Sequence, residues 1–185
     1  VINGRKCLNP LFIINAMARS PETLRVLDGT RFTIIHGDLN LTNIICDRHN
    51  HSFRFVDPRG KYGRAVKIFG DPSYDLMRIK ACLFYGYDTI VKGLYALAVR
   101  NGKVRVEVKL PSLYRRARKD LQKLFSEFFP EIHPLTYDIQ SVLYFLNLLP
   151  FHADSIERSL AYYYWGTYLL NEHFSESGGK YGALS

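Results

Sequence analysis

Apolar residues in much of the chain recur at the three- and four-residue spacing of amphipathic helices. The clearest case is the helix expected from Asp71 or Pro72 to about Tyr85, in which Leu76, Ile79 and Leu83 follow that period. Further helices are expected over residues 11–17 after the cap Asn9-Pro10, from Ser20-Pro21, over Thr89–Val99, and in three segments after Pro111 that are broken at Pro130, Pro134 and Pro150. Helix is therefore the dominant element of the prediction.

Short β elements are expected before and between these helices. Residues Thr33–Ile35, Asn43–Cys46 and Phe53–Val56 are brief apolar runs, and the last two are joined by the turn-rich segment Asp47–His51. The turn signal Asn101-Gly102 is followed by alternating valines from Val104 to Val108, which indicates a small hairpin or an extended segment. The fold class predicted is α+β, mainly helical.

Composition sets limits on this picture. The chain has 185 residues, of which 47% are hydrophobic, and this is enough for one sizeable core or two small ones. No apolar run reaches the roughly 18 residues that a membrane span needs, and Val1–Arg5 lacks the basic-then-apolar order of a secretory signal. We expect a cytoplasmic protein without a membrane partner.

The chain is basic, with a formal net charge of +8. Basic residues gather in two places: Arg115, Arg116, Arg118 and Lys119 in an expected helix, and Arg59, Lys61, Arg64 and Lys67 in an expected loop. A surplus of this kind attracts anions in general. We interpret the helical cluster as a solvated face rather than a nucleic-acid site, so nucleic acid is not an expected partner.

Three polar residues stand where a phosphotransferase needs them. Phosphoryl transfer requires a group that orients the attacking hydroxyl and accepts its proton, and hard oxygen ligands that hold Mg²⁺ on the phosphates. Asp38 and Asn43 flank a loop after one strand, and Asp57 ends a later strand. Pro58 favours an extended conformation for the residue before it, so the two strand ends are expected to aim these side chains into one cleft.

The same residues carry a family resemblance. The segments His36-Gly37-Asp38-Leu39-Asn40-Leu41-Thr42-Asn43, Val56-Asp57-Pro58-Arg59-Gly60 and Gly70-Asp71-Pro72-Ser73-Tyr74-Asp75-Leu76 together resemble the aminoglycoside phosphotransferase and choline kinase family, small-molecule kinases with a protein-kinase-like fold. The likeness is firm over about Phe32–Tyr85. It implies that the chain is the C-terminal lobe of such a fold, with a small β element that carries the catalytic and metal-binding loops.

The resemblance also implies roles for single residues. Asp38 is then the catalytic base, Asn43 a magnesium ligand and Asp57 the principal magnesium ligand, with ATP as the phosphoryl donor. Asp75 is expected to hold the backbone of the catalytic loop through its carboxylate, and His36 to shape that loop by packing and hydrogen bonding. Pro58 and Arg59 replace the Phe-Gly of protein kinases, which puts a protein-kinase type of activation switch in doubt.

The acceptor is expected in the helical part and stays open among an amino alcohol, an aminoglycoside and a sugar-type alcohol. The run Tyr162–Trp165 offers aromatic faces near carboxylates, although consecutive aromatics surround a helix and at least two must pack in the core. His152 and Asp154 are expected to cap the last helix while facing the cleft. The candidate substrate residues are Arg59, His152, Asp154, Glu157 and Trp165.

The domain prediction is a single catalytic and substrate lobe over residues 1–185. It consists of a helical lead-in over 1–31, the catalytic and metal loops over 32–70 and a helical substrate-binding part over 71–185. Only Val1–Ile35 precede His36, without the sheet and lysine of the family's nucleotide-binding lobe, so we expect a fragment or a shortened relative with very weak kinase activity. The alternative is a non-catalytic binding or scaffold module that keeps the kinase-like lobe.

Overall fold

The computed structural model describes residues 1–29, 32–60, 68–152 and 154–176 and divides the chain into two compact units that interleave along the sequence. The first unit contains residues 1–28, 89–109 and the chain from Ile139 onward. The second contains residues 29–88 and 110–138. The helical lead-in and most of the C-terminal helices thus belong to the first unit, and the expected catalytic loops belong to the second.

Side-chain caps start the two N-terminal helices of the first unit. Helix α1 spans Pro10–Arg19, and the Asn9 side chain accepts a hydrogen bond from the amide of Leu11. Helix α2 spans Pro21–Leu27, and Ser20 caps it in the same way through the amide of Thr23. In both helices proline occupies the first turn, where its missing N–H costs nothing. These two predicted helices are confirmed.

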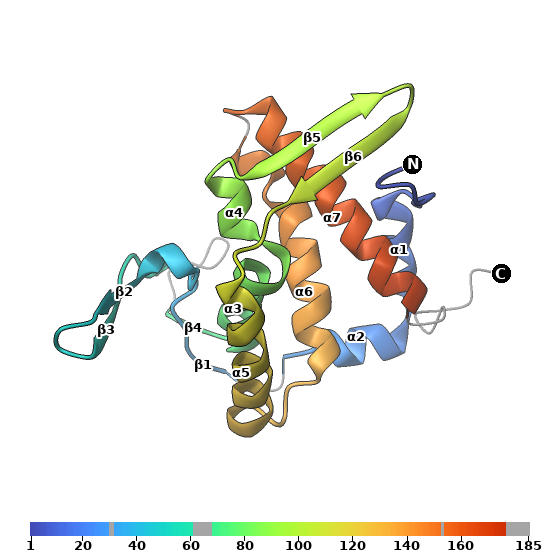
Figure 1. Ribbon diagram of the computed structural model, residues 1–185. Coiled ribbons are helices and arrows are strands. Elements are labelled where there is room, and N and C mark those ends of the chain that lie inside the picture. The colour runs from blue at the N-terminus through green and yellow to red at the C-terminus, as the bar shows by residue number, and fades with distance from the viewer. Residues whose placement is uncertain (30–31, 61–67, 153, 177–185) are drawn as a thin grey trace. The chain divides into compact units, whose positions relative to one another are not determined.

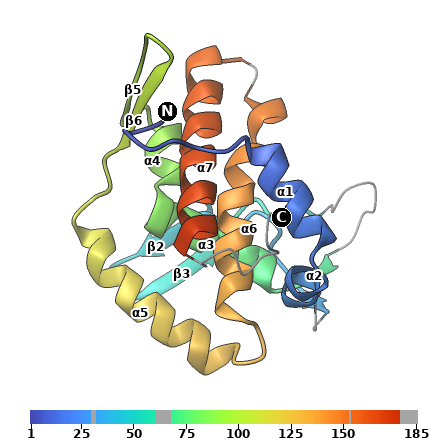
Figure 2. The same ribbon diagram turned by 90° about the vertical axis from the view of Figure 1, so that its right-hand side faces the viewer.

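A long C-terminal helix, α7 over Ile156–Glu176, organises the rest of the first unit. It contacts α1, and Asn171 on α7 bonds the backbone of Leu8, accepting from its amide at 2.7 Å and donating to its carbonyl at 3.1 Å. Figure 2 shows α1 beside α7. The unit also holds most of α6, Pro134–Asn147, and the short 3₁₀ helix η2, Leu149–Phe151.

The helix predicted over Thr89–Val99 is wrong. Helix α4 covers only Tyr87–Val91, and Tyr95–Arg100 forms strand β5, which pairs antiparallel with β6, Lys103–Val108 (Figure 1). Asn101 and Gly102 make the turn, both with positive φ, as a two-residue hairpin turn requires. The alternation of Tyr95, Leu97 and Val99 fits the pleat and prevails over the weaker helical period.

One face of this hairpin packs on α7. Val104 and Val106 of β6 form a buried cluster with Ile2. Partly buried residues from the hairpin, the N-terminal segment and α7 surround the cluster, namely Cys7, Leu97, Tyr164, Trp165 and Tyr168. The aromatic run of α7 therefore supplies part of a hydrophobic core.

The second unit combines small antiparallel sheets with helices. Strand β1, Thr33–Ile34, pairs with β4, Phe69–Gly70, and strand β2, Ile44–Asp47, pairs with β3, Ser52–Phe55. The 3₁₀ helix η1 spans Leu41–Asn43. The two larger helices are α3, Ser73–Tyr85, and α5, Leu113–Phe128. The three strands predicted around the polar loop are confirmed within a residue or two.

Helices α3 and α5 contact each other around a core of Leu76, Phe125, Ile132 and Tyr137. Arg118, one residue of the basic cluster on α5, donates to the carbonyl of Leu83 at 2.8 Å and lies 5.4 Å from the centre of the Phe84 ring. Arg115, Arg116 and Lys119 are exposed.

The described residues form seven α-helices and small antiparallel sheets, so the α+β, mainly helical class is confirmed. None of the helices in this described part is long and apolar enough to cross a membrane.

Candidate functional site

The Asp75 carboxylate holds the start of the loop that follows β1. Its Oδ2 accepts a hydrogen bond from the His36 amide at 2.6 Å, and its Oδ1 accepts one from the Gly37 amide at 2.8 Å. Asp75 is only 9% exposed, so both bonds lie away from bulk water, where charge-assisted hydrogen bonds are strongest. The contact agrees with the supporting position that the resemblance implies for Asp75.

Gly37 enables the tight path of this loop. Its φ is +76°, a conformation that glycine adopts without strain. A Cβ added there would lie 3.1 Å from the Cβ of Arg59, so a side chain would also crowd the neighbouring strand end.

Asp38 and Asn43 point toward one another. The Asn43 Nδ2 donates to the Asp38 backbone carbonyl at 2.9 Å and to the Asp38 Oδ2 at 3.1 Å. The side chain of Asn40 caps η1 by accepting from the amide of Thr42, which fixes the intervening turn. Two of the three oxygen-bearing residues predicted from the sequence are therefore in direct contact.

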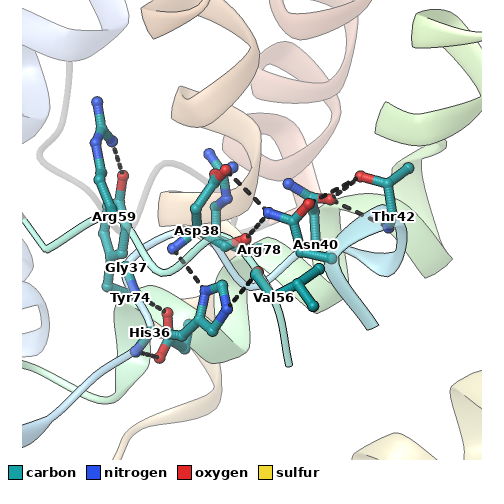
Figure 3. A network of polar contacts seen from close by, with 11 residues as sticks. His36, Gly37, Asp38, Asn40, Thr42, Val56, Arg59, Tyr74 and Arg78 are labelled. Carbon is teal, nitrogen blue, oxygen red and sulfur yellow. Dashed lines mark hydrogen bonds and ion pairs between the residues drawn. The ribbon is translucent and has the colours of Figure 1, made fainter. Parts of the chain in front are cut away.

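Arg78 forms an ion pair with the Asp38 carboxylate (Figure 3). The Arg78 side chain is 5% exposed and the Asp38 side chain 35% exposed, so a buried guanidinium holds a carboxylate that faces solvent. Asp75 and Arg78 are three residues apart in α3 and therefore share one face of the helix. That face aligns the whole loop from His36 to Asp38.

His36 connects the loop to the strand end that precedes Asp57. Its Nε2 lies 2.9 Å from the Val56 carbonyl, and its Nδ1 accepts from the Asp38 amide at 3.3 Å. A neutral ring that carries its proton on Nε2 satisfies both contacts. His36 thus acts as a bridge in the backbone network, in keeping with the loop-shaping role expected for it.

Two further backbone bonds bring the Asp57 segment to the loop. The Val56 amide donates to the Asn43 carbonyl at 3.0 Å, and the Arg59 amide donates to the His36 carbonyl at 2.8 Å. Asp57 lies between these two anchors. The extended conformation that Pro58 was expected to impose on Asp57 is wrong, because its φ is +56°. The flanking bonds outweigh the proline preference, and such backbone strain concentrates at functional sites.

Asn43 and Asp57 are the residues at this place whose side-chain oxygens could hold Mg²⁺. Asn43 turns its amide nitrogen to Asp38, and its Oδ1 lies 3.5 Å from the Thr42 hydroxyl. The Asp57 side chain is exposed. No group of three His, Cys, Asp or Glu residues that could hold a metal is found in the described part of the chain. Mg²⁺ in nucleotide sites usually binds one or two protein oxygens and completes its shell with water and phosphate.

Arg59 is a basic candidate whose backbone belongs to this network. It is exposed, and its Nη1 donates to the Tyr74 hydroxyl at 3.0 Å. The Arg59 side chain therefore contacts the start of α3, while its backbone amide bonds the His36 carbonyl. Lys61, Arg64 and Lys67, the other basic residues predicted for this loop, lie outside the described residues.

The remaining candidate residues belong to the first unit, where Trp165 takes part in packing. Its ring stacks on Tyr168 with centroids 5.6 Å apart and an interplanar angle of 14°. Both rings border the cluster formed by Ile2, Val104 and Val106. The nearby Tyr162 is fully buried. The expectation that at least two aromatics of the run serve the core is confirmed.

The predicted capping of α7 by His152 or Asp154 is wrong. The Ser155 side chain accepts a hydrogen bond from the Arg158 amide at 3.3 Å, which is the usual geometry of a serine cap. Asp154 is instead paired with Arg158 at 2.5 Å, and Glu157 is exposed. The pKa of His152 is lowered, first by burial and then by the charge of Arg158, while Asp154 opposes this shift.

Sequence reasoning missed Arg78 and Tyr74. Both lie on α3, and both bond residues that are distant in sequence, Asp38 and Arg59. One signal was present for Arg78: it interrupts the apolar run of the helix three residues after Asp75, on the same face.

Comparisons of this chain with protein-family models, with curated proteins and with solved structures gave no match.

Proposed function

We propose that the chain is the catalytic and substrate-binding lobe of an ATP-dependent phosphotransferase that acts on a hydroxyl of a small molecule. The observation that carries this proposal is the hydrogen-bond network joining Asp38, Asn43 and the Val56–Arg59 strand end. That network brings a carboxylate, a carboxamide and the backbone of a second carboxylate residue together, in the order and spacing of the family motif. A solvated loop has no need for such a network.

Each residue has a chemical task in this proposal. Asp38 accepts the proton of the acceptor hydroxyl and orients its oxygen, because it is the carboxylate of the network that combines solvent access with a fixed side chain. Arg78 holds the Asp38 carboxylate in place through an ion pair in which only the guanidinium is buried, and Asp75 holds the backbone amides before it. Positioning of this kind supplies much of the catalysis in phosphoryl transfer.

Asn43 and Asp57 would hold Mg²⁺ through their side-chain oxygens. The ion supplies charge neutralisation on the phosphates of the nucleotide. The neutral carboxamide of Asn43 adds an oxygen ligand without adding charge next to Asp38, which suits a site that already contains two carboxylates.

Exposed apolar side chains beside the site support the binding of a further protein part there. Large apolar side chains on the strands are well exposed, among them Ile34 at 65%, Phe53 at 66% and Phe55 at 61%. Exposed apolar surface of this kind marks interaction sites in soluble proteins. We propose that the nucleotide-binding part, a β-sheet with a lysine as the resemblance implies, packs there. This chain alone would then bind nucleotide mainly through metal and phosphate.

The test is phosphoryl transfer from γ-labelled ATP with Mg²⁺ and a panel of amino alcohols, aminoglycosides and sugars. We expect very slow labelling of one acceptor class, lost at least 100-fold in Asp38→Asn and in Asp57→Ala. The matched control is Asp120→Asn, which changes an exposed aspartate on α5. Labelling that persists in both variants would contradict the proposal.

The Asp38–Arg78 ion pair favours a second candidate, a non-catalytic binding module. An arginine that permanently neutralises Asp38 would keep it from acting as a base. The variant Arg78→Lys separates the two, because a lysine keeps the charge but loses the planar fork of the guanidinium. A phosphotransferase should then change its turnover and keep its KM for nucleotide. A binding module should show no turnover in either form.

A further inference from the structure

The second unit contains a cavity on a different side of α3 from the candidate site. It has a volume of about 400 Å³, which lies within the roughly 300–1,000 Å³ range typical of small-molecule sites. Its apolar wall consists of Phe125, Phe129, Pro130, Ile132, Pro134 and Tyr137. These residues come from the end of α5, the start of α6 and the loop between them.

Helix geometry separates this cavity from the catalytic loop. Lys80 lines the cavity, whereas Arg78 pairs with Asp38. Two residues along an α-helix correspond to about 200° of rotation, so these side chains leave α3 in nearly opposite directions. Leu76, one turn before Lys80, belongs to the core cluster next to the cavity. The cavity is therefore not part of the site built on Asp38.

One charged pair faces this apolar space. The Lys80 Nζ lies 2.5 Å from the Asp138 Oδ1, and the Tyr85 hydroxyl donates to the same oxygen at 3.0 Å. The Lys80 side chain is 8% exposed and the Asp138 side chain 22% exposed. A carboxylate has about four acceptor positions, so Asp138 can accept further hydrogen bonds from a ligand. Of the two charges, Asp138 is the more accessible.

The surroundings favour a positively charged ligand. The pKa of Tyr137 is raised to about 12, first by burial and then by the charges of Glu131 and Asp71, so two more carboxylates act on this wall of the cavity. Lys80 and Asp138 neutralise each other, so the surplus negative charge near this wall comes from Glu131 and Asp71. The Lys80 Nζ lies 5.1 Å from the centre of the Phe84 ring. Aromatic rings such as Phe125 and Tyr137 attract cations by their faces.

We propose that this cavity binds a small organic cation, an ammonium group on an aromatic or branched apolar body. The ammonium donates to Asp138 at the polar end, and the apolar body lies against the rings of Phe125 and Phe129. The proposal concerns a second site and does not depend on the phosphotransferase activity of the chain.

The test uses three ligands of one shape and different charge, titrated into the full chain and followed by amide chemical shifts. They are 2-phenylethylammonium, 2-phenylethanol and 3-phenylpropanoate. We expect the cation to bind at least 10-fold more tightly than the other two, with the largest shifts at Ser126, Ile132 and Asp138. Absence of binding by all three at millimolar concentration, or tighter binding of the anion, would overturn the proposal.

Two variants locate the binding. Asp138→Asn should remove the preference for the cation over the alcohol, while Asp120→Asn on the exposed face of α5 should leave it unchanged. Ser126→Phe fills the cavity from its exposed rim and should weaken the binding of all three ligands. This variant keeps the Lys80–Asp138 pair, so it still tests the proposal if Asp138→Asn does not fold. Binding that survives Ser126→Phe in a folded chain would place the ligand elsewhere and contradict the proposal.

Discussion

The loop from His36 to Asn43 and the aromatic run from Tyr162 to Trp165 differ in what their side chains contact. The loop makes polar contacts with α3 and with the Val56 strand end. The aromatic run makes apolar contacts with the hairpin β5–β6 and with α6. The contacts of the loop fix its geometry, and those of the aromatic run fill a hydrophobic core.

The difference lies in what each pattern requires of the chain. Consecutive aromatic residues point to all sides of a helix, and where the helix has apolar neighbours their packing explains these residues without a ligand. Buried and half-buried polar residues need hydrogen-bond partners. The loop finds some of them within itself, as between Asn43 and Asp38, and others at residues 20 to 40 positions away. The predictions below test this division between packing and polar positioning.

The largest effect is expected for Tyr162→Ala in the aromatic run. Tyr162 is fully buried, with the Phe145 ring centroid 6.1 Å away, so its truncation should leave a cavity. Loss of a buried aromatic costs about 4 kcal/mol of the free energy of unfolding. Denaturant unfolding measures this loss, and Leu160→Ala, at a position 38% exposed on the same helix, serves as the control with a much smaller loss. An equal loss in both variants would contradict the packing role.

The next effect is expected for Asp75→Ala in the second unit. Removing the carboxylate leaves the buried amides of His36 and Gly37 without their acceptor, which should cost about 3 kcal/mol. Hydrogen exchange at these two amides should accelerate along with the loss of stability. Asp120→Ala, on the exposed side of α5, should change neither property. Unchanged protection of both amides would show that Asp75 does not hold the loop.

The sequence predicts the elements that depend on local contacts better than those that depend on distant ones. Local signals were sufficient for the helices that start at Pro10 and Pro21, because capping residues and prolines act within one turn. They failed over residues 89–99, where the pairing of β5 with β6 decided the structure. The Asn101-Gly102 turn and the alternation on both sides of it are present in the sequence, but the helical spacing over residues 89–99 competes with the N-terminal half of that signal.

The site shows the same limit. The residues of the motif were evident, yet the left-handed conformation of Asp57 and the Asp38–Arg78 ion pair were not. Both depend on contacts between residues far apart in sequence. Neither local preference nor spacing contains information about such contacts.

A smaller effect is expected from the coupling between Asp38 and Arg78. A double-mutant cycle with Asp38→Asn and Arg78→Met should give an interaction energy of about 1–2 kcal/mol, less than for a fully buried pair because Asp38 is partly exposed. Urea unfolding of the four proteins provides the measurement. Additive losses would mean that the pair does not fix the carboxylate.

The smallest effect concerns pH and His152. Its pKa is lowered in the folded chain, so the folded state favours the neutral ring. The associated stability is present above the unfolded pKa near 6.5 and decreases as the pH falls below that value toward the folded pKa. His152→Gln should flatten this part of the stability curve. His49→Gln, at an exposed turn, should leave the curve as it is, and equal curves for all three proteins would refute the assignment.

The most direct test of the central claim is the binding of a divalent ion by Asn43 and Asp57 in the presence of ATP. Mn²⁺ in place of Mg²⁺ broadens the amide resonances of nearby residues, so we predict selective broadening at Asn43, Val56 and Asp57 that excess Mg²⁺ reverses. Asp57→Ala should abolish it. Broadening that is absent from these residues, or that persists in Asp57→Ala, would contradict a metal-assisted phosphotransferase site in this loop.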